Sequence, residues 1–211
     1  MSRILSIDSP LWAILNKLTD TIVLSLLFIL TSIPIVTMGS SLCALYYMMF
    51  RIADNTEGHV VRGYFKAFKE NFKKSTPVWL LCLFTGLVLA GDIFICVKAQ
   101  VPMAGFILAA AGVLTVLYMM LVLYLFPLLA KCTGDIRQLA FMAFMMSIKE
   151  WWRTIFMLFI TFIMFAVGVF VTAPFLIVAP GVIALSHVYI FKTIFAKYGM
   201  KEEERTCQNS L

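Results

Sequence analysis

Charged residues are scarce in this chain. Only 13% of its 211 residues are Asp, Glu, Lys or Arg, whereas a typical soluble domain has about 25%. Hydrophobic residues make up 62% of the chain, against about 45 to 50% in soluble domains, and they occur in long uninterrupted stretches. Stretches of this kind are stable in a lipid bilayer and not in water. The composition therefore excludes a soluble domain and predicts an integral membrane protein.

Motifs that carry known chemistries are also missing. The five cysteines show no CxxC spacing, so we expect neither a disulfide framework nor a zinc site. The sequence has no GxxxxGK[ST] phosphate loop, no HExxH motif and no GxSxG nucleophile turn. We therefore predict no catalytic residue, no metal site and no cofactor, and we expect that the protein is not an enzyme. The net charge of +6 is explained by basic loops beside anionic lipid, so no nucleic-acid partner is expected.

Six apolar stretches are predicted to cross the membrane as helices. The last one would reach about 60 Å as a single helix, so it must turn back near Pro174 and Pro180. The predicted fold is an all-α, polytopic transmembrane helical bundle forming a single membrane domain over 1–211, with amphipathic interfacial helices on the cytoplasmic side. We expect an interfacial N-terminal segment, six spans and a cytoplasmic tail at 1–17, 18–36, 38–53, 78–97, 103–130, 155–173, 179–196 and 197–211.

The positions of Lys and Arg predict the orientation of the spans, because basic residues near span ends are retained in the cytoplasm. With six spans, 16 of the 17 Lys and Arg residues share one side, and Lys98 alone lies on the other. With five spans, in which 38–53 lies at the membrane interface, the split is 14 to 3. We therefore favour six spans with both termini cytoplasmic, and five spans is the alternative.

A basic and aromatic segment follows the second span. Its aromatic residues recur at helical spacing, and its basic residues occupy the other faces. This pattern is typical of an amphipathic helix that lies in the headgroup layer, which is the interpretation we favour over docking to a cytoplasmic partner. The residues expected to contact lipid or a partner are Arg62, Tyr64, Phe65, Lys66, Phe68, Lys69, Phe72 and Lys73.

Two ionisable residues inside the predicted spans are candidates for function, because a charge is costly in lipid. Asp92 lies near the outer end of its span, where interfacial water or Lys98 is within reach. His187 lies in the last span. We favour a structural role for both residues, with His187 forming a hydrogen bond between helices, over an ion or proton site.

Several motifs, taken in order along the chain, resemble the YesL-like membrane proteins of Gram-positive bacteria. They are the turn 34–39 (PIVTMG), the segment 44–47 (ALYY), the segment 65–72 (FKAFKENF), Trp79 and the segment 124–129 (YLFPLL). Within the turn, Pro34, Thr37 and Gly39 carry the PxxTxG pattern and are expected to be structural. The resemblance implies a multi-pass protein of the bacterial plasma membrane. It supplies no catalytic residues.

The context of that family suggests a function. Its genes typically lie beside carbohydrate ABC importers, which implies an accessory subunit or regulator with the permease subunits as partners. This is an association and not a mechanism. The alternative function is a stand-alone small membrane transporter or channel. Both functions are compatible with a homo-oligomer and with membrane lipid as a binding partner.

Overall fold

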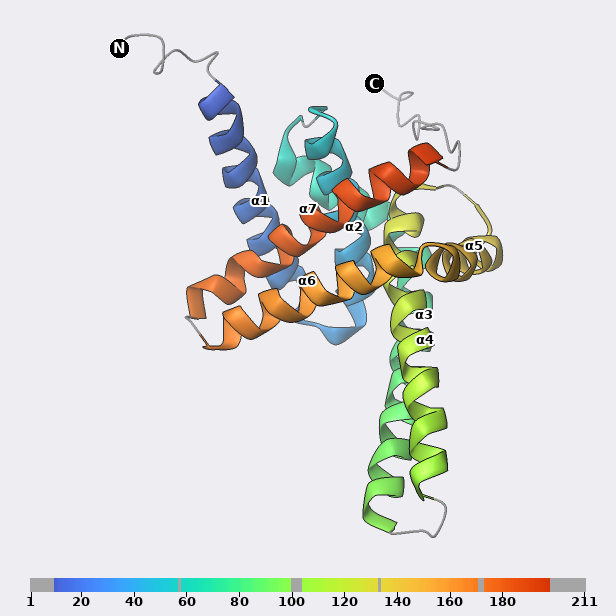
Figure 1. The fold of residues 1–211 in the computed structure, drawn as a ribbon. Coiled ribbons are helices and arrows are strands. Elements are labelled where there is room, and N and C mark those ends of the chain that lie inside the picture. Colours follow the sequence, from blue (N-terminus) through green and yellow to red (C-terminus); the bar gives the residue numbers. More distant parts are fainter. Residues whose placement is uncertain (1–9, 57, 100–103, 133, 171–172, 198–211) are drawn as a thin grey trace.

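The computed structural model describes residues 10–56, 58–99, 104–132, 134–170 and 173–197. This part of the chain has seven α-helices and one short 3-10 turn, and it contains no strand (Figure 1). Six of the helices are long and apolar enough to cross a membrane. The predicted all-α, multi-pass membrane fold is therefore confirmed. Residues 1–9 and 198–211, which belong to the predicted N-terminal segment and tail, lie outside the described residues.

The helices that could cross a membrane follow the predicted spans with three main differences. One is α1, which begins at Pro10 and so also includes residues 10–17 of the predicted interfacial segment, because no residue there interrupts a helix. The first turn of α1 and the last turn of α7 lie on the same side of the bundle (Figure 1). The helices are α1 (Pro10–Ser32), α2 (Met38–Ala53), α3 (Val60–Ala99), α4 (Ala104–Lys131), α5 (Ile136–Lys149), α6 (Trp151–Phe170) and α7 (Ala173–Lys197).

The short helix α2 is the centre of the bundle. It packs against α1, α3, α4 and α7, and 12 of its 16 residues are buried. At 1.5 Å per residue, α2 is about 24 Å long, which is shorter than the hydrocarbon layer. A helix lying at the membrane interface would leave its lipid face exposed. The burial of α2 within the bundle therefore favours six spans over five.

The turn between α1 and α2 is held against α3. Thr37 donates its hydroxyl to the carbonyl of Thr31 at 2.6 Å, next to the 3-10 turn Ile35–Thr37. The indole of Trp79 on α3 donates to the Ile35 carbonyl at 2.8 Å. A Cβ atom on Gly39 would lie 2.4 Å from the Cβ of Trp79, so only glycine permits this approach of α2 and α3. The residues of the turn thus fix the angle between the first three helices.

The second difference is the length of α3. The basic segment that we expected as a separate surface helix is the first part of this single 40-residue helix, which is about 60 Å long. Pro77 lies inside the helix and does not end it. Internal prolines are tolerated where neighbouring helices hold both halves, and α2 lies against α3 from Gly63 to Trp79, on both sides of Pro77. Figure 1 shows α3 and α4 side by side as a hairpin that extends well beyond the other helices.

The third difference is the start of α7, which already includes Pro174 and Pro180 instead of turning between them. A proline in the first turn of a helix interrupts no hydrogen bond. Near Pro180, the Ser25 hydroxyl of α1 accepts a hydrogen bond from the Gly181 N–H at 3.0 Å. The same hydroxyl lies 3.3 Å from the Val178 carbonyl as a donor. Contacts from α1 therefore support the part of α7 that proline weakens.

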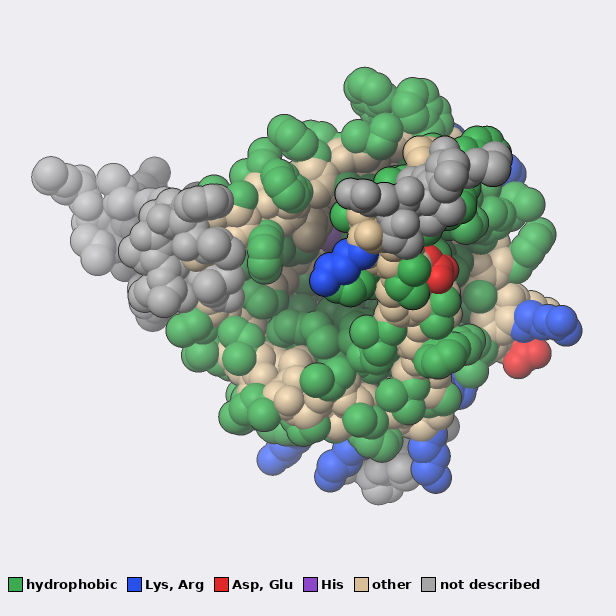
Figure 2. Space-filling view, turned by 90° about the horizontal axis from the view of Figure 1, so that it is seen from below, with side chains coloured by type: hydrophobic (Ala, Val, Ile, Leu, Met, Phe, Trp, Pro, Cys, Tyr) green, Lys and Arg blue, Asp and Glu red, His purple; other side chains and the backbone are tan. Residues whose placement is uncertain are grey.

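The surface of the molecule agrees with a lipid environment. Figure 2 shows a face covered mainly by hydrophobic side chains, with few charged ones. Many large apolar residues of α3, α4 and α6 are exposed, including Leu81, Phe84, Phe106 and Phe162. Exposure of this kind on a protein with six candidate spans indicates contact with lipid or with other membrane helices.

Candidate functional site: a buried histidine cluster

His187 lies at the centre of a polar cluster formed by three helices. It comes from α7 and is buried, with 1% of its surface exposed. Its Nδ1 lies 3.0 Å from the hydroxyl of Tyr46 on α2. Its Nε2 lies 3.1 Å from the hydroxyl of Thr161 on α6 and 3.3 Å from the Met157 carbonyl. Both ring nitrogens are therefore within hydrogen-bonding distance of a neighbouring helix.

The partners assign the tautomer of the imidazole. The Met157 carbonyl can only accept, and the Thr161 hydroxyl already donates to that carbonyl at 2.9 Å. The proton of His187 is therefore placed on Nε2, which donates, and Nδ1 accepts from the Tyr46 hydroxyl. A neutral imidazole satisfies every partner in this arrangement. The rings of Tyr46 and His187 are also nearly parallel, at 9°.

The cluster ties α2, α6 and α7 together inside the bundle. Hydrogen bonds between membrane helices contribute about 0.6 kcal/mol each on average, and some contribute more. This geometry is the helix-to-helix bonding that we favoured for His187. Chemically, the cluster can hold a neutral imidazole in one orientation. Nowhere in the described part of the chain do three His, Cys, Asp or Glu side chains lie close enough together to bind a metal ion.

Asp92 is not part of this cluster. It is exposed on the far half of α3, in the α3–α4 hairpin. The cation that we considered as its partner, Lys98, instead lies over the ring of Phe94, with Nζ 4.6 Å from the ring centroid. Residues six positions apart lie on different faces of a helix, which separates Asp92 from Lys98. The two intramembrane candidates therefore belong to separate parts of the molecule.

The basic and aromatic segment at the start of α3 has two faces. Tyr64 is fully buried, and its hydroxyl lies 2.7 Å from that of Thr31 on α1, so Tyr64 contacts neither lipid nor a partner. Phe68 also packs against the core, whereas Phe65 and Phe72 are each 38% exposed. The outward face carries the exposed cations Arg62, Lys66, Lys69 and Lys73. The structure thus divides the segment into a packing face and a basic face.

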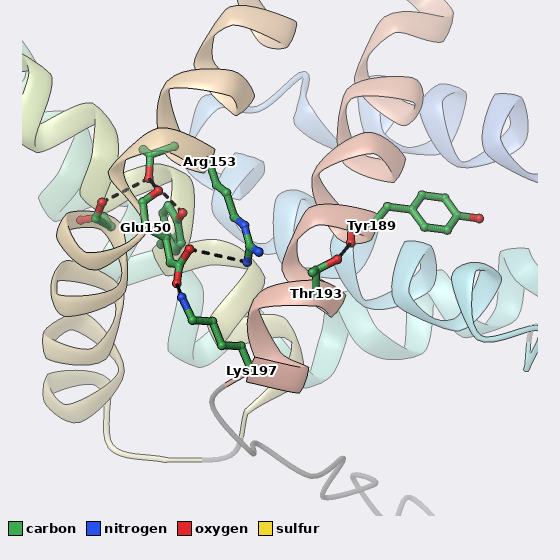
Figure 3. A network of polar contacts seen from close by, with 8 residues as sticks. Glu150, Arg153, Tyr189, Thr193 and Lys197 are labelled. Atoms are coloured by element: carbon green, nitrogen blue, oxygen red, sulfur yellow. Dashed lines mark hydrogen bonds and ion pairs between the residues drawn. The ribbon is translucent and has the colours of Figure 1, made fainter.

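A second polar network joins α5, α6 and α7 around Glu150. This carboxylate is 8% exposed and lies between Arg153 and Lys197 (Figure 3). The Lys197 ammonium donates to Oε1 at 2.5 Å, and Arg153 Nη1 lies 3.6 Å from Oε2. Nearby, the Thr154 hydroxyl bonds to the Tyr124 hydroxyl at 2.9 Å. Paired in this way, the buried carboxylate connects the start of α6 to the end of α7.

Lys192 makes another contact between helices. Its ammonium forms an ion pair with Asp54 and donates to the Ala53 carbonyl at 3.2 Å. These groups lie at the C-terminal end of α2, where a cation is favoured by the helix dipole. The contact thus fixes α7 against the end of the central helix.

Sequence reasoning did not assign a role to Glu150, Thr161 or Lys192. Tyr46 was noted only as part of a motif. Glu150 could have been identified from the sequence, because it is an acidic residue on the predicted cytoplasmic side of the spans, where nearly all the cations are expected. Thr161 offers no such signal, because a threonine in an apolar helix usually bonds to its own backbone.

Part of the chain is similar to a known protein family. Residues 21–93 match a family described as "Protein of unknown function, DUF624". The match covers the second half of α1, all of α2 and most of α3, and so includes the turn held by Trp79. Neither a curated protein nor a solved structure matches the chain. The protein is therefore a multi-pass membrane protein, and one segment of it is similar to an uncharacterised family.

Proposed function

We propose that the protein is a non-catalytic integral membrane subunit that binds other membrane helices through its α3–α4 hairpin. The resemblance to YesL-like proteins makes permease subunits of a carbohydrate ABC importer the partner of choice, with this chain as an accessory subunit or regulator. In this proposal the termini and the basic face of α3 lie in the cytoplasm of a bacterial cell. The count of Lys and Arg residues supports that orientation.

The exposed surface of the α3–α4 hairpin is the observation that supports this proposal. In the most apolar 18-residue stretch of α3, and likewise of α4, only 6% of the residues are buried inside the protein. In the corresponding stretch that covers α2, 61% of the residues are buried. The two helices hold each other, for example through the Tyr118 hydroxyl, which donates to the Cys82 carbonyl at 2.7 Å. Much of the remaining surface of the hairpin is available to other helices.

The outward face of α4 is suited to close helix packing. Gly105, Ala109 and Gly112 lie on one side of α4, because they are spaced by four and three residues. All three are exposed, and nothing lies within 4 Å of the point where a Cβ on either glycine would be. Ala111, by contrast, is buried. Small residues on one face allow two membrane helices to approach closely, as in small-xxx-small motifs.

Replacing Gly105 and Gly112 with leucine tests this proposal. The leucines meet open space within the chain, so we expect an unchanged fold. They would obstruct a partner helix, and overpacking of about 1 to 3 kcal/mol lowers affinity by about fivefold to a hundredfold. The measurement is affinity purification from the native host in mild detergent, with quantitative mass spectrometry of the co-eluting proteins.

We expect permease subunits to co-elute with the wild type and to be lost from the double variant. The matched control is Gly58→Leu, because Gly58 is also surrounded by open space but lies outside the hairpin. Elution of the wild type alone or as a homo-oligomer would contradict the accessory function. Equal recovery of the partner with both variants would show that α4 is not the docking face.

A stand-alone transporter is the second candidate, and it is motivated by the six candidate spans and by the ionisable residues Asp92 and His187 within them. This candidate predicts that purified protein in liposomes carries a sugar or an ion across the membrane. We expect Asp92→Asn or His187→Ala to abolish that flux if either side chain contacts the substrate. A wild-type protein without flux would eliminate this function, and flux unaffected by both substitutions would remove Asp92 and His187 from the transport path.

A further inference from the structure

A pocket of about 260 Å³ lies on the outer surface between α6 and α7. One side of its lining is apolar and is formed by Trp152, Phe156 and Ile190. The other side is polar and is formed by Arg153 and Thr193. The volume is several times the ~30 Å³ that one water molecule occupies in the liquid. The pocket can therefore receive a small polar group attached to an apolar body.

The Arg153 guanidinium supplies the charge of this pocket. Figure 3 shows it reaching from α6 toward α7, between Glu150 and Thr193. Its Nη1 lies 3.6 Å from Glu150 Oε2, which is too far for a hydrogen bond, and this buried nitrogen has no hydrogen-bond partner in the described chain. The other oxygen of Glu150 is held by Lys197. The arginine side chain as a whole is 33% exposed, and because Nη1 is buried, a group in the pocket reaches the other atoms of this side chain.

A guanidinium with open donors is suited to phosphate. Its planar fork binds two phosphate oxygens at once, and charge-assisted hydrogen bonds of this kind are about twice as strong as those between neutral groups. The Thr193 hydroxyl, which donates to the Tyr189 carbonyl at 3.2 Å, can still accept a hydrogen bond. The polar side of the pocket therefore offers both a cation and an acceptor.

The surroundings of the pocket indicate an amphipathic ligand. Trp152 is 72% exposed, and tryptophan is enriched at the depth of lipid headgroups. Beyond the pocket, α6 exposes Phe159, Phe162 and Phe165 along its length. An acyl chain attached to a headgroup in the pocket would lie along this surface, whereas a free phosphate ion would gain nothing from it.

We propose that this pocket binds the phosphate headgroup of an anionic phospholipid, with Arg153 as the phosphate ligand and Trp152, Phe156 and Ile190 as the contact for the glycerol and upper acyl chain. The site is independent of the function proposed for the α3–α4 hairpin. It lies at the end of α6 and α7 where Arg153, Lys192 and Lys197 gather, the side that the distribution of cations assigns to the anionic cytoplasmic leaflet.

The test uses the full-length protein purified in a neutral detergent. It is titrated with dioctanoyl-phosphatidylglycerol, with the zwitterionic dioctanoyl-phosphatidylcholine or with inorganic phosphate. Native mass spectrometry gives the stoichiometry and affinity, and thermal unfolding gives the stabilisation. We expect one phosphatidylglycerol per chain, with a Kd that rises about tenfold in Arg153→Gln. Arg137→Gln, an exposed arginine on α5, loses the same charge and should bind like the wild type.

A second variant tests the pocket in a different way, so that the result does not depend on Arg153→Gln alone. Ile190→Trp fills the pocket and retains Arg153, so it should reduce phosphatidylglycerol binding as Arg153→Gln does. Equal loss in Arg153→Gln and Arg137→Gln would show general charge attraction and overturn the site. Equal binding of both lipids would remove the role of the anion. Binding of inorganic phosphate as tight as that of phosphatidylglycerol would show an anion site and not a lipid site.

Discussion

Substituting leucine for Gly181 should cause the largest loss of stability of any single change considered for this protein. A Cβ at this position would lie 2.1 Å from the Ser25 hydroxyl and 2.7 Å from the Thr21 carbonyl oxygen. The second of these atoms belongs to the backbone of α1 and cannot rotate away. We expect a loss of about 3 kcal/mol or more, at the upper end of the range for overpacking.

The measurement is the free energy of unfolding in mixed micelles, together with the yield of monodisperse protein. Gly112→Leu is the matched control, since the same side chain there meets open space and also removes a helical glycine. We expect the control to be as stable as the wild type. A Gly181→Leu protein with wild-type stability would disprove the close approach of α1 and α7.

Removal of the His187 side chain should have the second-largest effect. His187→Ala leaves a cavity in the core, and it leaves the Tyr46 and Thr161 hydroxyls without the imidazole. A cavity and unsatisfied buried groups together predict a loss of about 2 to 4 kcal/mol. The chain's other histidine, His59, is exposed, so His59→Ala should change stability by less than about 0.5 kcal/mol.

A double-mutant cycle separates the hydrogen bond from the packing. Tyr46→Phe removes the hydroxyl that donates to Nδ1 and keeps the aromatic ring. Combined with His187→Ala, it should show an interaction energy of about 0.5 to 1 kcal/mol. Additive losses in the free energy of unfolding would mean that the two side chains do not interact, which would contradict the assigned cluster.

The membrane fold could be predicted because burial in lipid depends on local composition. The span predicted at 38–53 coincides with α2, which runs from Met38 to Ala53 between the turn at Pro34 and the polar Asp54. The span predicted at 103–130 differs from α4 by one residue at each end. In both cases, polar or helix-breaking residues end an apolar stretch, and the hydrocarbon layer requires helical hydrogen bonding within it.

Helix continuity was harder to predict because it depends on contacts from other helices. The basic segment before Pro77 resembles a separate surface helix in sequence, and packing against α2 makes it part of α3. In α7, Pro180 resembles the start of a helix, and the Ser25 hydroxyl of α1 supports the chain on both sides of it. The strength of a proline as a helix breaker was thus decided by residues far away in the sequence.

The sequence by itself determined that this protein is helical and has the composition of a multi-pass membrane protein, and it predicts that most cations lie on one side of the spans. Only the tertiary structure decided which polar residues meet, such as Tyr46, Thr161 and His187. It also decided that Tyr64 faces the core and that Arg153 borders a pocket. The physical reason is that lipid-facing and helix-facing surfaces are equally apolar, so hydrophobicity reveals which segments enter the membrane but not which of their faces pack together.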